Sequence, residues 1–249
     1  MISFFKSKYY LKDILPENYI DIHNHLLPGI DDGARSILET NELISKMKFL
    51  NINQAIATPH TYHGLWNNTP KTIKKSFEIA TKSDSNLLFL KGYASEYLLD
   101  ATLVKRAQEE QLLCLKDSYI LIELHLINNP LNLYEMLFEL KNKGYKIIIA
   151  HPERYLYFHN DMKKFEKLRA SGVYFQLNLL SLTGYYGTPI QKKAEKLLQH
   201  DLYDFTGTDV HNDNQITTLI KKPILFSNKN KIGDLLRENN LFILNKVPE

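Results

Sequence analysis

The sequence contains a single cysteine, Cys114, among its 249 residues, so no disulfide can form within the chain. An isolated thiol is typical of proteins from a reducing compartment. The sequence shows no signal peptide and no apolar run long enough to cross a bilayer. We therefore expect a cytoplasmic protein without a transmembrane segment.

The chain also has little excess of charge of either sign. Its 31 Lys and Arg residues against 28 Asp and Glu residues give a formal net charge of +3. The basic residues are scattered over helix-like stretches, which is typical of a solvated surface and argues against a nucleic-acid partner. No proline- or glycine-rich linker divides the sequence, so we predict one domain over residues 19–249, preceded by an extension at residues 1–18.

Apolar runs of strand length alternate with segments of helical periodicity along the whole chain. The strand candidates are residues 19–23, 54–58, 87–95, 119–126, 146–150, 173–179 and 202–208. The helix candidates are residues 36–50, 70–83, 101–111, 131–143, 161–171 and 189–200. Such alternation predicts an α/β fold with parallel strands, and apolar runs such as "KIIIA" are typical of strands covered on both faces.

A barrel fits this pattern better than an open sheet, because no glycine-rich nucleotide-binding turn follows the first strand candidate. Within "YIDIHNH" we expect the side chains of Asp21, His23 and His25 to share one strand face. Two imidazoles beside a carboxylate suggest a metal, although a single H-x-H motif also arises by chance.

Metal-type ligands follow six of the seven strand candidates. They are His23 and His25, then His60, Glu96, Glu123 and His151, and finally Asp209 with His211. In a parallel barrel the C-terminal ends of all strands open on the same face, so these side chains are expected to converge. Imidazole and carboxylate ligands without a thiolate predict a two- or three-metal cluster of Mn, Fe or Zn.

The runs "DIHNHLLPGIDDGA", "ATPH", "SEY", "LIEL", "AHPERY" and "TDVHN" occur in this order between about Asp21 and about Leu219. In order and spacing they resemble the manganese-dependent tyrosine-protein phosphatases of the polymerase-and-histidinol-phosphatase (PHP) superfamily, CpsB/YwqE type. These enzymes are associated with capsule and exopolysaccharide synthesis. The resemblance implies a distorted (β/α)7 TIM-like barrel and a phosphotyrosine protein substrate, with a polysaccharide-synthesis tyrosine kinase as the expected partner.

The resemblance also implies the site residues. The metal ligands fall on His23, His25, Asp32, His60, Glu96, Glu123, His151, Asp209 and His211. Asp32 enters by the resemblance alone, because "DDG" before a helix is also ordinary turn chemistry. Arg154 matches an arginine placed to receive the phosphate, and a guanidinium can hold two phosphoryl oxygens at once. The metals, most simply two or three Mn²⁺, would supply a bridging hydroxide that attacks phosphorus.

Three features leave alternatives open. A second arginine that follows the last motif in the family is absent, since Asn214, Gln215 and Ile216 occupy this stretch. Either Lys221 or Lys222 approaches the phosphate in place of this arginine, or activity on phosphotyrosine is weaker. His63 is expected either to hydrogen-bond the phosphate or leaving group, or to be a plain loop residue. His125 either lines the site or is a satisfied core histidine.

Two further functions compete with a protein phosphatase. A phosphoesterase acting on a small metabolite such as histidinol phosphate would use the same metals, and a regulatory module would keep the barrel without turnover. Cysteine-dependent tyrosine phosphatases are excluded, because their C-x5-R signature would require arginine where Ile120 stands.

Overall fold

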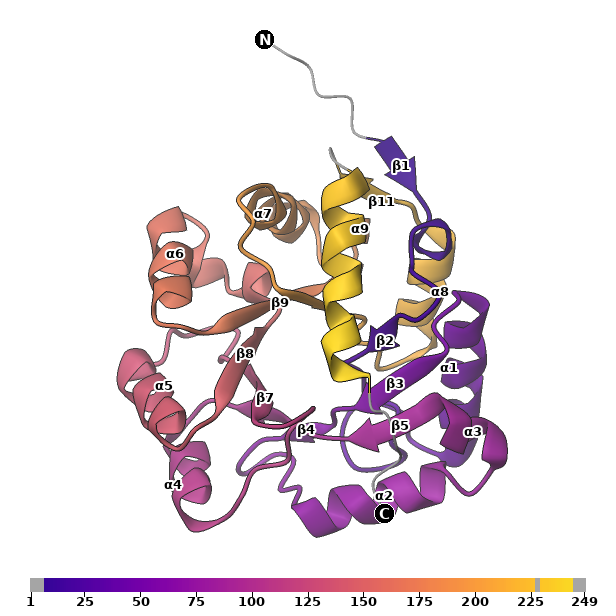
Figure 1. Cartoon of the computed structure of the whole chain (residues 1–249), viewed down its shortest axis with the longest axis horizontal. Helices are drawn as coiled ribbons and strands as arrows, with labels where there is room; N and C mark the ends of the chain where they lie inside the picture. Colours follow the sequence, from indigo (N-terminus) through magenta and orange to yellow (C-terminus); the bar gives the residue numbers. More distant parts are fainter. Residues whose placement is uncertain (1–6, 227–228, 244–249) are drawn as a thin grey trace.

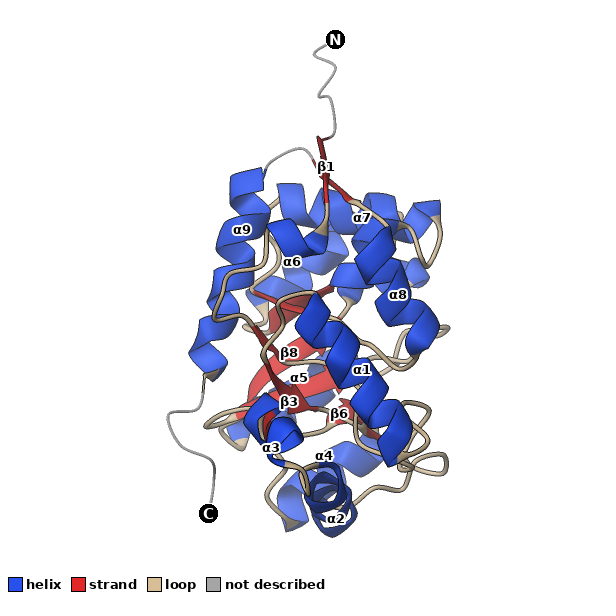
Figure 2. Ribbon diagram, turned by 90° about the vertical axis from the view of Figure 1, so that its right-hand side faces the viewer, coloured by secondary structure: helices blue, strands red, loops and turns tan. Residues whose placement is uncertain are grey.

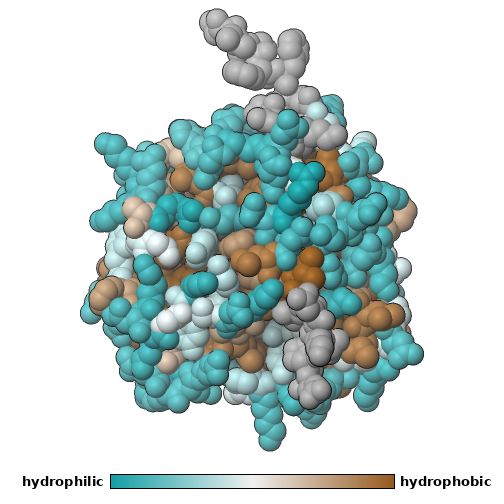
Figure 3. Space-filling model, in the orientation of Figure 1, coloured by the Kyte–Doolittle hydropathy of each residue, from teal (hydrophilic) through white to brown (hydrophobic). Residues whose placement is uncertain are grey.

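The computed structural model describes residues 7–226 and 229–243 of the chain. Helices surround a centre of parallel strands (Figure 1). Residues 1–6 of the predicted extension, and residues 244–249 at the end of the predicted domain, lie outside the described residues. Hydrophilic side chains cover most of the periphery of the face shown in Figure 3, as the composition predicts for an ordinary globular protein.

The strands form two parallel sheets that are linked into a ring. One sheet contains, in order, β2 (Ile20–Asp21), β3 (Gln54–Ala57) and β5 (Leu90–Tyr93). The other contains, in order, β10 (Phe205–Gly207), β9 (Tyr174–Asn178), β8 (Lys146–Ala150), β7 (Tyr119–Glu123), β6 (Glu96–Leu98) and β4 (His60–Thr61). The chain runs from β3 into β4 and from β5 into β6, and Asn24 bridges Val210 in parallel. The predicted α/β class is therefore confirmed.

Helical crossovers connect these strands where the sequence predicts them. The predicted helices correspond to α1 (Ile37–Phe49), α2 (Pro70–Ala80), α4 (Ala101–Glu109), α5 (Leu133–Asn142), α6 (Met162–Ala170) and α7 (Thr188–Gln199). Side-chain caps mark the starts of α1 and α2. The Ser36 side chain accepts from the Glu39 amide, and Thr69 and Thr72 form a capping box around the first turn of α2, which begins at Pro70.

Three helices were not expected: α3 (Asp84–Phe89), α8 (Asp213–Lys221) and α9 (Lys229–Glu238). The strand predicted at residues 87–95 is wrong at its start, because the side chain of Ser83 caps a short helix that runs to Phe89. Short 3₁₀ helices complete the fold: η1 (Leu11–Asp13), η2 (Pro152–Arg154), η3 (Leu156–Phe158), η4 (Leu179–Thr183) and η5 (Asn239–Phe242).

Two hydrophobic cores lie on the two faces of the strands. In β8 the side chains of Ile147 and Ile149 join the core between strands and helices, whereas Ile148 and Ala150 join the core inside the ring. All four residues are fully buried. This explains why the strand reads as a continuous apolar run, since strands covered on both faces need apolar residues at every position.

The end of the ring opposite the strand C-termini is closed by α9 and η5. The buried Asn239 side chain donates to the carbonyls of Ile20 and Thr206 and so ties β2 to β10. Near the N-terminus, β1 (Ser7–Tyr9) pairs antiparallel with β11 (Ile224–Phe226). Figure 2 shows this pair beyond the ring of helices. None of the helices within residues 7–226 and 229–243 is both long and apolar enough to cross a membrane.

Candidate metal centre

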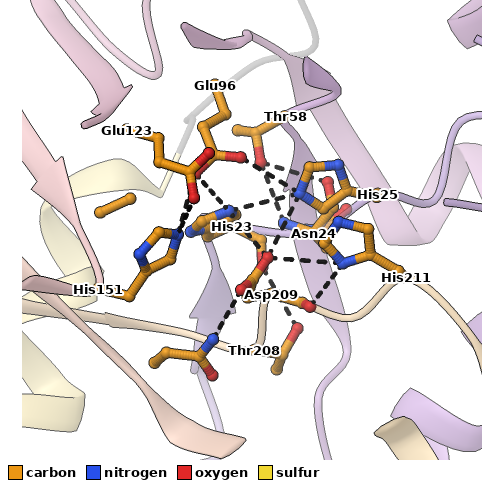
Figure 4. Close-up of polar contacts among 12 residues, drawn as sticks. His23, Asn24, His25, Thr58, Glu96, Glu123, His151, Thr208, Asp209 and His211 are labelled. Atoms are coloured by element: carbon orange, nitrogen blue, oxygen red, sulfur yellow. Dashed lines mark hydrogen bonds and ion pairs between the residues drawn. The ribbon is translucent and has the colours of Figure 1, made fainter. Parts of the chain in front are cut away.

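The fold brings all nine predicted ligands together near the C-terminal ends of the strands. Figure 4 shows His23, His25, Glu96, Glu123, His151, Asp209 and His211 among them. The ligands form four overlapping groups, and within each group the nitrogen and oxygen atoms lie within 4.8 Å of one another. These groups are His25, Asp32, His60 and His211; His23, His25 and Asp209; His23, Glu96 and His151; and His60, Glu96 and Glu123. The residues come from elements far apart in the sequence, so the cluster depends on the complete fold.

Glu96 lies at the centre of this cluster. Its carboxylate oxygens approach His60 Nδ1 at 2.9 Å and the Nε2 atoms of His23 and His151 at 3.3 Å each. The side chain is fully buried, and neither oxygen accepts a well-formed hydrogen bond from the described residues. A buried carboxylate without hydrogen bonds is costly unless a cation neutralises it, so this position fits a metal ligand.

Imidazole nitrogens also face one another. The Nε2 atoms of His23 and His25 are 3.4 Å apart, and those of His60 and His211 are 3.5 Å apart. Although burial opposes charging, Glu96 and Asp209 raise the pKa of His23 well above its usual value. Without metal, the histidine side chains of the cluster would therefore bind protons, and divalent ions would displace these protons on binding.

Two of the nine residues have left-handed backbone conformations. His151 has φ +32° and Asp209 has φ +52°, a region that residues other than glycine rarely adopt. His151 directly follows β8, and Asp209 lies two residues after the end of β10. Such conformations persist only where the surrounding structure holds them, and they concentrate at functional sites.

Several orienting side chains were not predicted from the sequence. Asp31 Oδ2 lies 2.8 Å from His25 Nδ1 and accepts from the His60 amide at 3.0 Å. Gln176 Oε1 lies 2.8 Å from His23 Nδ1, and Asn178 Nδ2 donates to Asp209 at 2.7 Å. These contacts leave the Nε2 atoms of His23 and His25 directed into the cluster.

The two adjacent aspartates of "DDG" have different environments. Asp31 is buried, and although burial opposes its charge, His25 lowers its pKa to about 2. Asp32 is 51 % exposed and approaches both His60 Nε2 and His211 Nε2 at 3.5 Å. Gly33 must be glycine here, because a Cβ atom would collide with the carbonyl oxygen of His25. Asp31 therefore orients a predicted ligand, while Asp32 is itself a candidate ligand.

Replacing Asp31 by asparagine is expected to weaken Mn²⁺ binding by about 10- to 100-fold, since it removes the carboxylate that fixes the tautomer of His25. Calorimetric titration of the metal-free variant measures this change. Asp13→Asn is a control, because Asp13 lies in η1, outside the cluster. Unchanged affinity in Asp31→Asn would contradict the orienting role.

A cavity of about 280 Å³ opens onto the cluster. Arg154 lines it, and its Nη1 atom donates to Asp209 Oδ2 at 2.9 Å while its guanidinium lies 4.5 Å from the centre of the Tyr186 ring. Arg154 is the single Lys or Arg side chain among the described residues that line this cavity. The aromatic and apolar part of its lining comprises Tyr62, Trp66, Leu126 and Tyr186.

Other residues considered from the sequence lie elsewhere. His63 is exposed and lines a neighbouring cavity, and Lys221 and Lys222 are exposed at the end of α8 without lining the metal-site cavity. His125 is an exposed loop residue whose Nδ1 accepts from the Ile127 amide at 3.2 Å, so neither expectation for it is correct.

The expectation that Asp21 shares a face with the two histidines is also wrong. β2 ends at Asp21, so strict alternation stops there. The Asp21 carboxylate instead accepts from the amide and the hydroxyl of Thr208, at 2.9 and 2.7 Å. It thus joins the first and last strands of the ring and belongs to none of the four ligand groups.

A family model described as "Capsular polysaccharide synthesis, CpsB/CapC" matches residues 19–246 of the chain. The chain belongs to this family. Among CpsB/CapC relatives, the putative tyrosine-protein phosphatase CapC of Staphylococcus aureus is 30% identical over 196 residues, which cover 78% of this chain and 77% of that protein. The tyrosine-protein phosphatase YwqE of Bacillus subtilis (strain 168) is 31% identical over 198 residues, with the same coverage.

A solved structure supports the same placement. It comes from work on YwqE of Bacillus subtilis and CpsB of Streptococcus pneumoniae, which are described as metal-dependent tyrosine phosphatases. The TM-score is 0.78 at 26% sequence identity, and the match covers 91% of this chain and 95% of the other. This CpsB/CapC chain therefore shares their fold.

Proposed function

We propose that this protein is a metal-dependent phosphatase that hydrolyses phosphotyrosine in proteins. The observation that carries the proposal is the convergence of nine imidazole and carboxylate side chains, six of which line a cavity that also contains Arg154. Relatives named tyrosine-protein phosphatases support this substrate class. We further propose two or three Mn²⁺ ions as the native metals, with Fe or Zn as alternatives.

Bound divalent ions would lower the pKa of water towards ~7 and withdraw charge from the phosphoryl group. The chain itself supplies the remaining parts of the mechanism. Asp209 holds Arg154 at the cavity wall, where its guanidinium can donate to two phosphoryl oxygens. Attack by water in line with the leaving group then needs no phosphorylated side chain, and a tyrosinate with a parent pKa of ~10 leaves with little assistance.

The rim of the cavity favours an aromatic ester over a small polar metabolite. Tyr62 and Trp66 line it, and the Trp66 ring stacks on His60 with centroids 4.6 Å apart. Flat apolar surfaces at the mouth provide contact area for the ring of phosphotyrosine. Histidinol phosphate carries an alkyl phosphate and would gain less from these surfaces.

The test is phosphate release from a phosphotyrosine peptide and from histidinol phosphate, each measured with added Mn²⁺. We expect kcat/KM to be at least 10-fold higher for the peptide. Turnover of histidinol phosphate alone would indicate a phosphoesterase that acts on a small metabolite. A metal-loaded chain that hydrolyses neither substrate would indicate a regulatory module.

Cys114 is expected to be dispensable. The thiol is partly buried, which raises its pKa to about 11, so only about 0.1 % is thiolate at pH 8. Cys114→Ser should keep its kcat/KM within about twofold of the wild type, and iodoacetamide should leave the activity intact. Rapid inactivation by iodoacetamide, prevented in Cys114→Ser, would contradict a metal-dependent mechanism.

The physiological partner we propose is a tyrosine kinase of polysaccharide synthesis, and the proposed location is the cytoplasm. The capsular family to which the chain belongs supports this kind of partner. The single thiol supports the location.

A further inference from the structure

A second cavity lies beside the metal-site cavity and shares a wall with it. Its volume is about 510 Å³, and Tyr62 lines both cavities. Its other walls include His63, Asn67 and residues from the first turns of α4, among them Thr102. Ligand pockets in proteins typically measure about 300–1,000 Å³, so the second cavity is large enough to hold part of a ligand.

The shared wall is a tight turn over residues 62–67. The Tyr62 amide donates to the Trp66 carbonyl at 2.9 Å, and the Trp66 amide donates back to Tyr62 at 3.0 Å. Gly64, at φ +82°, supplies the left-handed residue that the turn requires. Trp66 lines the metal-site cavity, whereas His63 and Asn67 line the second one. One rigid turn therefore separates the two cavities.

Several side-chain polar groups on this turn have no hydrogen-bond partner among the described residues. The buried hydroxyl of Tyr62 makes no hydrogen bond there. The His63 ring makes no hydrogen bond or ion pair with residues 7–226 or 229–243, and Asn67 engages only its oxygen, which accepts from the Gly64 amide at 2.9 Å. A buried hydroxyl without a partner is costly, so it points to a ligand or water at this wall.

The charged groups of the second cavity are largely paired with one another. Arg106 Nε lies 3.1 Å from Glu110, and Lys105 Nζ lies 3.7 Å from Glu109. Asp100 caps α4 by accepting from the Leu103 amide at 2.8 Å. With two basic and three acidic side chains on its walls, the cavity carries little net charge, which suits peptide groups better than an anion.

We propose that the second cavity binds the residues flanking the phosphotyrosine of an extended polypeptide substrate. This inference rests on the proposed function, because the phosphotyrosine itself would occupy the metal-site cavity. An extended chain advances about 3.3–3.6 Å per residue, so a few residues next to the phosphotyrosine can cross the turn at residues 62–67. A free amino acid or a small metabolite is too short to use both cavities.

The experiment compares a seven-residue peptide that has a central phosphotyrosine with free O-phosphotyrosine. We expect the KM of the wild type to be at least 10-fold lower for the peptide. Thr102→Trp, which fills the cavity, and His63→Ala should each raise the KM for the peptide at least fivefold. Both should change the KM for free phosphotyrosine less than twofold and retain the metal content of the wild type. Ser45→Trp is the matched control, because Ser45 is an exposed position of α1 that lines neither cavity.

Other outcomes would overturn the inference. Unchanged peptide kinetics in both variants would show that the second cavity is not used. Parallel losses with both substrates would assign His63 to the reacting phosphate or leaving group instead. A wild type that hydrolyses neither substrate would overturn the proposed function together with this inference, whereas parallel losses leave the phosphatase function standing.

Discussion

Replacing Asp209 by asparagine is expected to lower kcat/KM for a phosphotyrosine peptide by at least about 10³-fold and to reduce the bound metal. Asp209 Oδ1 lies 3.2 Å from His23 Nε2, while Oδ2 accepts from Arg154 Nη1 at 2.9 Å and Asn178 Nδ2 at 2.7 Å. An amide has only one oxygen. Its NH₂ group must therefore face either the metal ligands or two hydrogen-bond donors.

The chain offers a close control for this variant. Asp201 also has a left-handed backbone, with φ +55°, but its side chain is 75 % exposed and pairs with Lys231 far from the cluster. Asp201→Asn tests the same chemical change in the same backbone conformation and should retain full activity. If Asp209→Asn kept its metal and more than a tenth of the wild-type kcat/KM, Asp209 would not be a ligand.

The second large effect is expected for Arg154→Lys, which should lower kcat/KM about 10²-fold with the metal content unchanged. The guanidinium is positioned by Asp209 and by the Tyr186 ring, and it can donate two parallel hydrogen bonds to a phosphoryl group. A lysine presents a single point charge, so it keeps the charge and loses the geometry. Steady-state kinetics with elemental analysis of the same sample separate the two effects.

Arg169→Lys is the matched control for Arg154→Lys. Arg169 also pairs with an aspartate, Asp204, at 2.8 Å and lies over the ring of Tyr174, but it lines no part of the metal-site cavity. Its replacement should leave kcat/KM within about twofold. Equal losses in both lysine variants would mean that the Arg154 effect is structural, and no loss in either would remove Arg154 from the proposed mechanism.

The order of the longer strands and helices was predictable from periodicity, because apolar runs mark strands that are covered on both faces and amphipathic segments mark the crossover helices. Short elements were harder to predict. The helix at Asp84–Phe89 has only six residues, too few for a periodic signal, and its leucines read as the start of the next strand. The end of β2 at Asp21 was equally hard to predict, since the hydrogen bonds that turn Asp21 away come from Thr208, which is 187 residues away in the sequence.

Most candidate ligands could be predicted because they follow a strand candidate, where a family motif also marks them, whereas Asp32 came from the motif alone. The orienting residues could not be predicted. Gln176 and Asn178 lie on β9, in an ordinary apolar run, and their role appears only once β9 lies next to β10. Gly207 shows the same dependence, because a Cβ atom there would lie 2.5 Å from the Cβ atom of His23. Contacts between distant elements cannot be deduced from local pattern.

We infer that the nine side chains gathered at one end of the ring form one multinuclear metal centre. Elemental analysis of the chain after Mn²⁺ loading and gel filtration, with Asp209→Asn treated in parallel, tests this directly. We expect two or three metal ions per chain in the wild type and a clear loss in the variant. A wild type that retains fewer than one ion per chain, or a variant that retains as many as the wild type, would contradict it.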